Sequence, residues 1–290
     1  MTASALPPFR PLDAYQAYLF DVDGTLVYPG RAIQGAAEAV QALKRAGKRT
    51  LIVTNNSVFS RAEMASRLRG FGFPIDEADV ATALVATAVF IAQERPGAQV
   101  HVLGSHGLRL ELTRARLEVV EDGVGAEYLV IGSDPEVSYE RLTRAMRVAE
   151  AGARIVAVNL DRSLPDPQGN FPGAAMFVGA IQGATGRQPD IVIGKPSPWL
   201  LEEVLTLVGL PAEECLFVGD SLLTDVPAAR AVGMPCLLVL TGVTDRALLE
   251  TVDQQPEYVL ENLEALAGLL APGRDAPAAD GALAKDGVTR

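Results

Sequence analysis

Short apolar runs alternate with longer amphipathic stretches along most of the chain. Each run has the length and the apolar, often β-branched composition of a buried strand. The runs lie at residues 18–20, 50–54, 100–103, 128–131, 154–158, 191–193, 215–218 and 236–240. Stretches with helical spacing lie at residues 34–46, 61–69, 81–94, 108–116, 139–151, 174–185, 200–208 and 228–232. Strands that alternate with helices in this way are typical of an α/β fold with a parallel sheet.

The middle of the chain repeats this alternation by itself. From about residue 79 onward it contains its own predicted strands and helices, which indicates a second domain rather than a long loop. A length of 290 residues suits one large or two medium domains. Residues 159–173 carry several prolines and glycines and are predicted to form a stiff loop. Residues 271–290, rich in Ala, Gly, Pro and Asp, are predicted to be a disordered tail.

Two aspartates follow the first apolar run. Residues two apart in an extended backbone face the same side, so Asp21 and Asp23 are expected to point together while Val22 turns inward. Two close carboxylates repel each other, and a hard cation such as magnesium would remove that repulsion. The simpler alternative is an Asp-Gly turn that closes a strand, which is common.

Polar residues also follow three later strands. Thr54, Asn55 and Asn56 come after the second run, Lys195 after residues 191–193, and Asp220 with Asp225 after residues 215–218. Because ligands of parallel sheets bind beyond the carboxyl ends of the strands, these residues are candidates for one site. The alternatives are an ordinary turn for the first group, a solvated lysine for the second, and an N-terminal helix cap for the third.

Composition narrows the choice of partners. The formal net charge of −11 and a pI near 4.8 exclude nucleic acid as an expected partner, since basic side chains supply most of that affinity. Without a signal-peptide pattern or an apolar run of bilayer length, we expect a cytoplasmic protein with no membrane partner. Cys215 and Cys236 lie in apolar runs and are expected to be reduced core residues. His101 and His106 are expected to be structural or surface residues.

Together, the four polar groups in this order resemble the four motifs of the haloacid dehalogenase (HAD) superfamily of phosphatases. Residues 132–135 with Tyr139, the loop at 159–173, and residues 184–190 and 193–198 resemble its NagD-like, or p-nitrophenyl phosphatase, branch (subfamily IIA). This resemblance covers roughly residues 17–245. It implies a doubly wound, Rossmann-like parallel-sheet core at 1–78 and 188–270, with an inserted α/β cap domain at 79–187.

The resemblance also implies a role for each motif residue. Asp21 would be the nucleophile, Asp23 the acid and then the base, and Lys195 would bridge Asp21 and the phosphate. Thr54, Asn55 and Asn56 would bind phosphate, the first through its hydroxyl and the second through its backbone amide. The site residues for Mg²⁺ would be Asp21, the Asp23 carbonyl and Asp220, with Asp225 one layer further out.

The implied activity is that of a magnesium-dependent phosphomonoester hydrolase working through an aspartyl-phosphate. The second aspartate, which dehalogenases of this superfamily lack, favours phosphorus chemistry. Its substrate would be a small phosphorylated metabolite: a sugar phosphate, phosphoglycolate, a nucleotide monophosphate, pyridoxal phosphate or p-nitrophenyl phosphate. The alternatives are a non-catalytic phosphate-sensing binding protein and a phosphoryl transferase. A homodimer formed through the cap is a further family expectation. Ser221 and Leu160 depart from the branch pattern, which frequently has arginine and proline there.

Overall fold

The computed structural model describes residues 10–253 and 255–269. The predicted disordered tail at 271–290 lies outside the described residues. The chain divides into two compact units: one runs up to Ile52 and includes Leu68–Pro74 and the chain from Leu205, and the other comprises Val53–Arg67 and Ile75–Val204. The boundaries expected for a core at 1–78 and 188–270 and a cap at 79–187 stay a prediction.

The first unit is built on a parallel sheet whose order changes direction at its centre. Its strands run β15 (Tyr258–Leu260), β14 (Cys236–Val239), β13 (Cys215–Gly219), β1 (Ala17–Phe20) and β4 (Arg49–Thr54); the short strand β5 (Val80–Thr82) belongs to the second unit. All the β1 and β13 residues are buried. From β1 the chain moves outward to β4, whereas from β13 it moves the opposite way to β14 and β15. Such a switch point opens a crevice at the carboxyl ends of the two central strands.

Short helices accompany this sheet. They are α1 (Ala36–Arg45), α8 (Asp225–Ala231), α9 (Arg246–Leu249) and α10 (Glu264–Leu269), while α2 (Arg61–Gly70) and α7 (Trp199–Val208) cross the division between the units. The first unit also contains a two-stranded ribbon, β2 (Val27–Tyr28) and β3 (Arg31–Ala32), and the 3₁₀ turn Ala212–Glu214, whereas a second 3₁₀ turn, Glu77–Asp79, belongs to the second unit. None of the helices in the described part of the chain is both long and apolar enough to cross a membrane.

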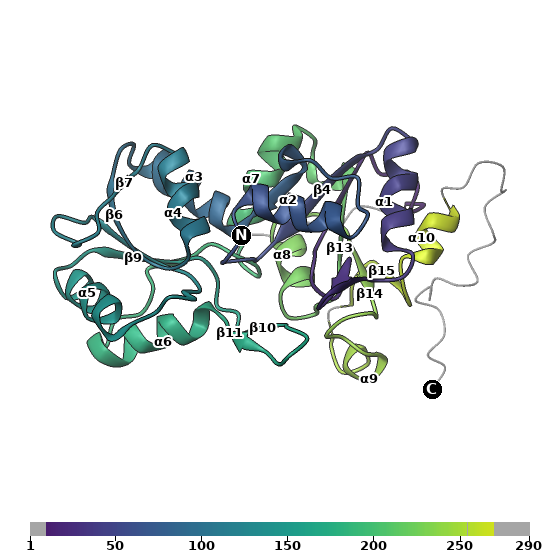
Figure 1. Cartoon of the computed structure of the whole chain (residues 1–290). Coiled ribbons are helices and arrows are strands. Elements are labelled where there is room, and N and C mark those ends of the chain that lie inside the picture. Colours follow the sequence, from purple (N-terminus) through teal and green to yellow (C-terminus); the bar gives the residue numbers. More distant parts are fainter. Residues whose placement is uncertain (1–9, 254, 270–290) are drawn as a thin grey trace. The chain divides into compact units, whose positions relative to one another are not determined.

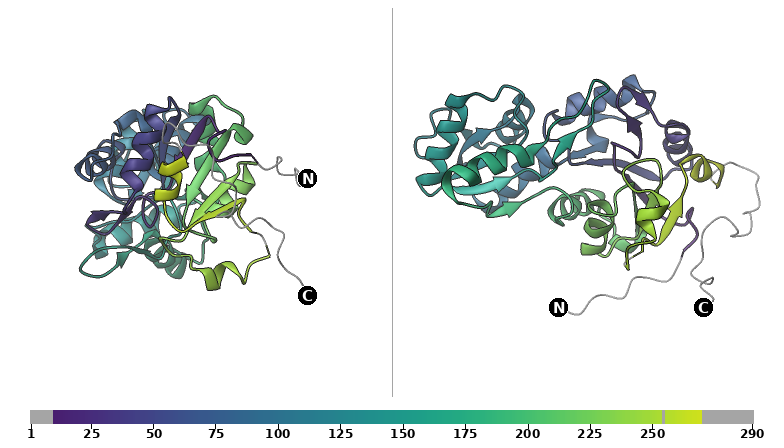
Figure 2. Two further views of the ribbon diagram at one scale, coloured as in Figure 1. Left: turned by 90° about the vertical axis from the view of Figure 1, so that its right-hand side faces the viewer. Right: turned by 90° about the horizontal axis from the view of Figure 1, so that it is seen from below.

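The second unit contains a separate parallel sheet. Its order is β12 (Ile191–Val192), β9 (Arg154–Ala157), β8 (Tyr128–Ile131), β6 (Gln99–Leu103) and β7 (Glu118–Val119). Helices α3 (Ala83–Glu94) and α4 (His106–Arg114) pack together on one face of the sheet (Figure 1). Helices α5 (Tyr139–Glu150) and α6 (Ala174–Thr185) pack on the other face, which the right-hand view of Figure 2 shows from below. The sheet therefore has its own switch point between β6 and β8.

The α/β class and most elements match the sequence predictions, and the differences are local. The helix expected from residue 81 begins at Ala83, because Ala81 and Thr82 belong to β5 and the Thr82 hydroxyl caps the helix by accepting the Val85 amide. The loop at 159–173 contains a small hairpin, β10 (Ser163–Leu164) and β11 (Phe171–Pro172). Strands of two or three residues are too short for the alternation that reveals longer ones.

Both cysteines are buried and free in the structure, as expected of reduced core residues. Burial raises the pKa of the Cys215 thiol to about 11, so this thiol is protonated as well as shielded at pH 8. We expect a thiol reagent such as DTNB to react with neither cysteine in the native protein at pH 8 and with both after unfolding in guanidinium chloride. Rapid reaction of either thiol before unfolding would contradict this burial.

Candidate active site

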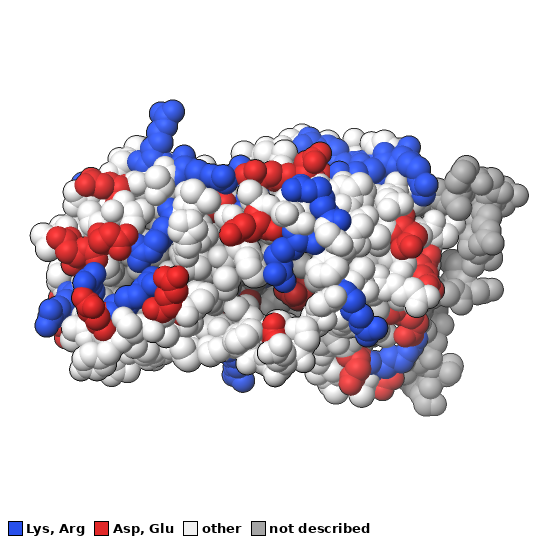
Figure 3. Space-filling view, in the orientation of Figure 1, with Lys and Arg blue, Asp and Glu red and all other residues white. Residues whose placement is uncertain are grey.

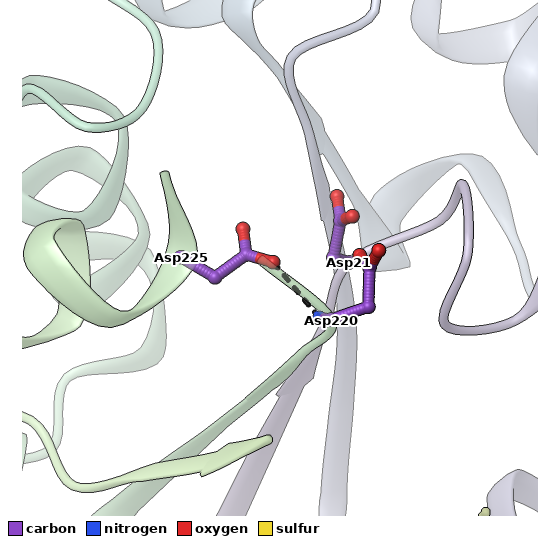
Figure 4. A group of neighbouring side chains, drawn as sticks. All are labelled: Asp21, Asp220 and Asp225. Carbon is purple, nitrogen blue, oxygen red and sulfur yellow. Dashed lines mark hydrogen bonds between the residues drawn. The ribbon is translucent and has the colours of Figure 1, made fainter. Parts of the chain in front are cut away.

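Three carboxylates gather at the switch point of the first sheet. Asp21 follows β1 directly, Asp220 follows the neighbouring strand β13, and Asp225 is the first residue of α8. A carboxylate oxygen of each lies within 4.8 Å of the others (Figure 4). Asp220 and Asp225 are buried, and Asp21 is half-buried. Residues far apart in the sequence are thus brought together by strand adjacency.

Backbone amides fix two of these carboxylates. Oδ2 of Asp225 accepts the amides of Asp220 and Ser221, each at 3.0 Å, which ties the start of α8 to the end of β13 (Figure 4). Oδ2 of Asp220 accepts the amide of Val243 at 2.7 Å, from the loop after β14. These hydrogen bonds fix the orientation of two of the three carboxylates.

Glycines make room for the cluster. Gly24 has a φ of 83°, a conformation that L side chains rarely adopt, and a Cβ there would lie 2.5 Å from Oδ2 of Asp220. A Cβ on Gly242 would overlap the same oxygen, and one on Gly219 would overlap the Asp225 carboxylate. Sequence analysis missed Gly242 and Val243. Their only signal in the sequence is their position after the apolar run at 236–240, which an ordinary turn shares.

The donor set fits a hard divalent cation. At an effective dielectric constant of 20, two full negative charges 4.8 Å apart repel by about 3 kcal/mol. Three close carboxylates, two of them buried, therefore need a positive charge nearby to remain ionised. All the donors are oxygens, which suits a cation such as magnesium or calcium better than a softer metal. The cluster can hold such an ion.

Asp23 is not one of these three clustered carboxylates. It is exposed, in the turn after β1, where it forms an isolated bridge with Val27. Val22 between the two aspartates is buried, as its predicted inward orientation requires. The pair thus differs in environment, with one carboxylate in the cluster and the other in contact with solvent.

In the second unit, Asn55 joins the turn after β4 to the loop that carries Lys195. Oδ1 of Asn55 accepts the Lys195 amide at 2.8 Å, and Nδ2 donates to the Lys195 carbonyl at 3.0 Å and to Oδ1 of Asp161 at 3.2 Å. The Asn159 side chain donates to the Asn55 carbonyl. Asn55 and Lys195 are both buried. This interlocked set fixes the backbone of the lysine.

The neighbouring Thr54 and Asn56 have different partners. Thr54 is buried, and its hydroxyl oxygen accepts the Asn56 amide at 3.1 Å. The Asn56 side chain donates to the Phe59 carbonyl at 2.6 Å and accepts the Phe59 and Val58 amides at 3.2 and 3.3 Å. Asn56 therefore holds its own turn, although the sequence suggested the same role for both asparagines. Asn159 and Asp161, which sequence analysis placed only in a loop, also follow the carboxyl end of a strand, β9.

We expect Asn55→Ala to lower the free energy of unfolding by about 2–4 kcal/mol, because it leaves buried main-chain groups of Lys195 without partners. Urea denaturation followed by circular dichroism measures this change. Asn170→Ala is the control, since Asn170 is exposed, and it should change stability by less than about 0.5 kcal/mol. Equal effects of the two substitutions would show that the Asn55 contacts do not stabilise the fold.

A second expectation concerns Gly242→Ala. The added methyl group would overlap Asp220 and displace its carboxylate, so affinity for Mg²⁺ should fall about tenfold or more. Isothermal titration of the protein with MgCl₂ measures this affinity directly. Gly268→Ala is the control, because a Cβ there meets nothing within 4 Å. An affinity for Mg²⁺ that Gly242→Ala leaves at the wild-type value would show that the cluster does not bind the ion.

Comparisons with known proteins agree with this geometry. The family model described as haloacid dehalogenase-like hydrolase matches residues 18–118, which include Asp21. A second model, of HAD-like hydrolases, matches residues 192–266, which include Lys195, Asp220 and Asp225.

Relatives and solved structures extend the similarity to most of the chain. The sugar-phosphatase AraL of Bacillus subtilis is 35% identical over 255 residues, covering 88% of this chain and 93% of the relative. The structure of p-nitrophenyl phosphatase from Archaeoglobus fulgidus has a TM-score of 0.82 and 40% identity, over 88% of this chain and 98% of that one. Glycerol phosphate phosphatase from Mycobacterium tuberculosis, solved in complex with calcium, has a TM-score of 0.81 and 34% identity, over 89% and 77% of the two chains.

Proposed function

The chain belongs to the haloacid dehalogenase-like hydrolase family, in its NagD-like and p-nitrophenyl phosphatase branch, and we propose that it is a magnesium-dependent phosphomonoesterase acting through an aspartyl-phosphate. Phosphatase activity follows from the family, because the relatives are named phosphatases. The identity of the metal and the covalent intermediate are our proposal. The observation that carries it is the cluster of Asp21, Asp220 and Asp225 at the switch point of the first sheet.

The environments of the two aspartates after β1 support unequal roles. Asp21, in the cluster, attacks phosphorus with a carboxylate oxygen while the bond from phosphorus to the leaving oxygen breaks. Asp23 donates a proton to that leaving oxygen. Asp23 then takes a proton from water, which attacks the aspartyl-phosphate, releases inorganic phosphate and restores the Asp21 carboxylate. Because Asp23 is exposed, it can exchange its proton with solvent between turnovers.

The metal would be held by the carboxylates of Asp21 and Asp220 and by the Asp23 main-chain carbonyl. Asp225 would act indirectly, by holding Asp220 in position, since one oxygen of Asp225 already accepts the backbone amides of Asp220 and Ser221. When bound, the cation neutralises part of the charge on the transferring phosphoryl group. Magnesium is our choice because it binds through few protein oxygens and keeps sites for water and phosphate.

Phosphate recognition is assigned to residues of the second unit. The Thr54 hydroxyl, the Asn55 backbone amide and the Lys195 ammonium would contact the phosphoryl group, and Asn56 would contribute by holding the turn that presents them. The Asn55 side chain supports this assignment, because its two hydrogen bonds to the Lys195 amide and carbonyl fix the backbone from which the lysine side chain extends. A compact ammonium group fits between two anions better than a planar guanidinium does.

The substrate is a small phosphorylated molecule, and we propose one whose leaving group is a hydroxylated aliphatic chain or ring. The names of two of the compared proteins, a sugar-phosphatase and a glycerol phosphate phosphatase, support this class. We also propose that two copies of the chain associate through the second unit, where Tyr139 and Val124 are largely exposed. No observation on the described residues favours a phosphate sensor or a phosphoryl transferase over a hydrolase.

The decisive substitution is Asp21→Asn, which removes the attacking carboxylate but keeps its shape. Hydrolysis of p-nitrophenyl phosphate with MgCl₂ should fall by at least about 10³-fold in kcat. EDTA should abolish wild-type activity, and added Mg²⁺ should restore it.

The matched control is Asp13→Asn, which changes an exposed aspartate of the same unit and should leave kcat unchanged. The same assay with glycerol 3-phosphate and a hexose phosphate then ranks leaving groups by kcat/KM. Asp21→Asn protein that is folded and keeps wild-type turnover would rule out the aspartyl-phosphate route.

A further inference from the structure

The second unit contains a cavity of its own, apart from every residue assigned above. Its volume is about 270 Å³. The charged and titratable side chains that line it are His101, Arg109, Glu121, Glu136, Arg141 and Arg144. All of them belong to the second unit.

The cavity lies near the switch point of the second sheet. Arg141 donates to the Gly104 carbonyl at 2.8 Å, just after β6, and pairs at 2.9 Å with the buried Asp134, just after β8. The helices that follow these strands, α4 and α5, lie on opposite faces of the sheet (Figure 1). In open α/β sheets, ligands bind in the crevice at this place.

Three guanidinium groups reach the cavity from these two helices. Arg109 comes from α4, and Arg141 and Arg144 come from α5. Arg109 also donates to the Val102 carbonyl at 2.9 Å, so its position is fixed by the edge of β6. A set of converging arginines is suited to binding a phosphate or carboxylate group through paired hydrogen bonds.

Of the acidic partners of these arginines, Glu121, Glu136 and Glu140 are exposed, whereas Asp134 is buried and holds Arg141 in place. Glu121 pairs with Arg109 and Glu136 with Arg141, but their side chains are 69% and 85% exposed. Exposed ion pairs contribute little to stability, so an anionic ligand can replace these two at little cost. Figure 3 shows acidic and basic side chains interleaved at the end of the molecule where Figure 1 labels β6, β7 and α5.

The buried side chain of His101 adds a hydrogen-bond acceptor. Its Nδ1 lies 2.8 Å from the Val120 carbonyl, and since a carbonyl only accepts, Nδ1 carries the proton. Burial, together with Arg109 and Arg144, lowers the pKa of this imidazole, which keeps it neutral and leaves Nε2 as an acceptor. Among the described residues Nε2 has no hydrogen-bond partner. Hydroxyl groups of a ligand can donate to Nε2 and to the two glutamates.

We propose that this cavity is a second ligand site, for a small anion that also carries hydroxyl groups. The arginines bind the anionic group, and His101 with the two glutamates accepts hydrogen bonds from the hydroxyls. A phosphate monoester of a polyol and a hydroxycarboxylate share this chemistry. The site is independent of the Asp21 reaction, because none of its residues takes part in the proposed hydrolysis.

Calorimetry on the full chain in EDTA, without added metal, tests the site with three probes: inorganic phosphate, glycerol 3-phosphate and L-malate. At least one probe should bind the wild type, and Arg144→Gln should weaken that binding about tenfold to a hundredfold through loss of a charged contact. Glycerol 3-phosphate should bind more tightly than inorganic phosphate, because its hydroxyl groups can donate hydrogen bonds to His101 and the two glutamates. The comparison with L-malate shows which anionic group the arginines prefer.

Arg147→Gln is the matched control, because Arg147 is exposed on the same helix, carries the same charge and does not line the cavity. Arg109→Gln tests the α4 side of the cavity, and circular dichroism confirms that each variant is folded. Arg144→Gln should hydrolyse p-nitrophenyl phosphate at the wild-type rate. The proposal is overturned if no probe binds, if Arg144→Gln leaves binding unchanged, or if Arg147→Gln weakens it equally.

Discussion

Mutual repulsion among the carboxylates of Asp21, Asp220 and Asp225 is the constraint that the first unit has to satisfy. Their oxygens lie within 4.8 Å, and two of the three side chains are buried. Amides of Asp220, Ser221 and Val243 stabilise the charges, and glycines at three positions let the backbones approach. This arrangement requires β1 and β13 to be neighbours. The position of these two strands at the centre of the sheet therefore makes a cation site feasible, and with it phosphatase chemistry.

The sequence predicted the class of fold and the three aspartates that the structure brings together, because both depend on local pattern. An apolar run followed by an acid or an amide indicates a strand end, and parallel sheets bring such ends to one edge. Gly242 and Val243 escaped this reasoning since one acts by lacking a side chain and the other through its main-chain amide. Neither property distinguishes a site residue from an ordinary turn until the neighbouring Asp220 is placed.

Asn55 and Asn56 show a second limit of sequence reasoning. The two residues are identical and adjacent, yet one reaches across to the main chain of Lys195 and the other closes its own turn. The role of each asparagine depends on the direction in which its side chain points after β4. The type of residue does not determine that direction. The division into compact units crosses β4, α2 and α7 rather than following loops, and the core and cap boundaries expected from the sequence stay a prediction.

The two sheets use the same topological feature with different side chains. At the β1–β13 switch point, acids gather and suit a cation, whereas near the β6–β8 switch point three arginines gather. The buried Asp134 orients Arg141 there. Burial raises the pKa of the Asp134 carboxyl group above its ordinary value, although the neighbouring Arg141 partly opposes this rise. A net charge of −11 describes the whole chain and opposes binding to an extended polyanion. It does not oppose a small anion, because at contact distance the local guanidinium groups outweigh distant charges that solvent screens.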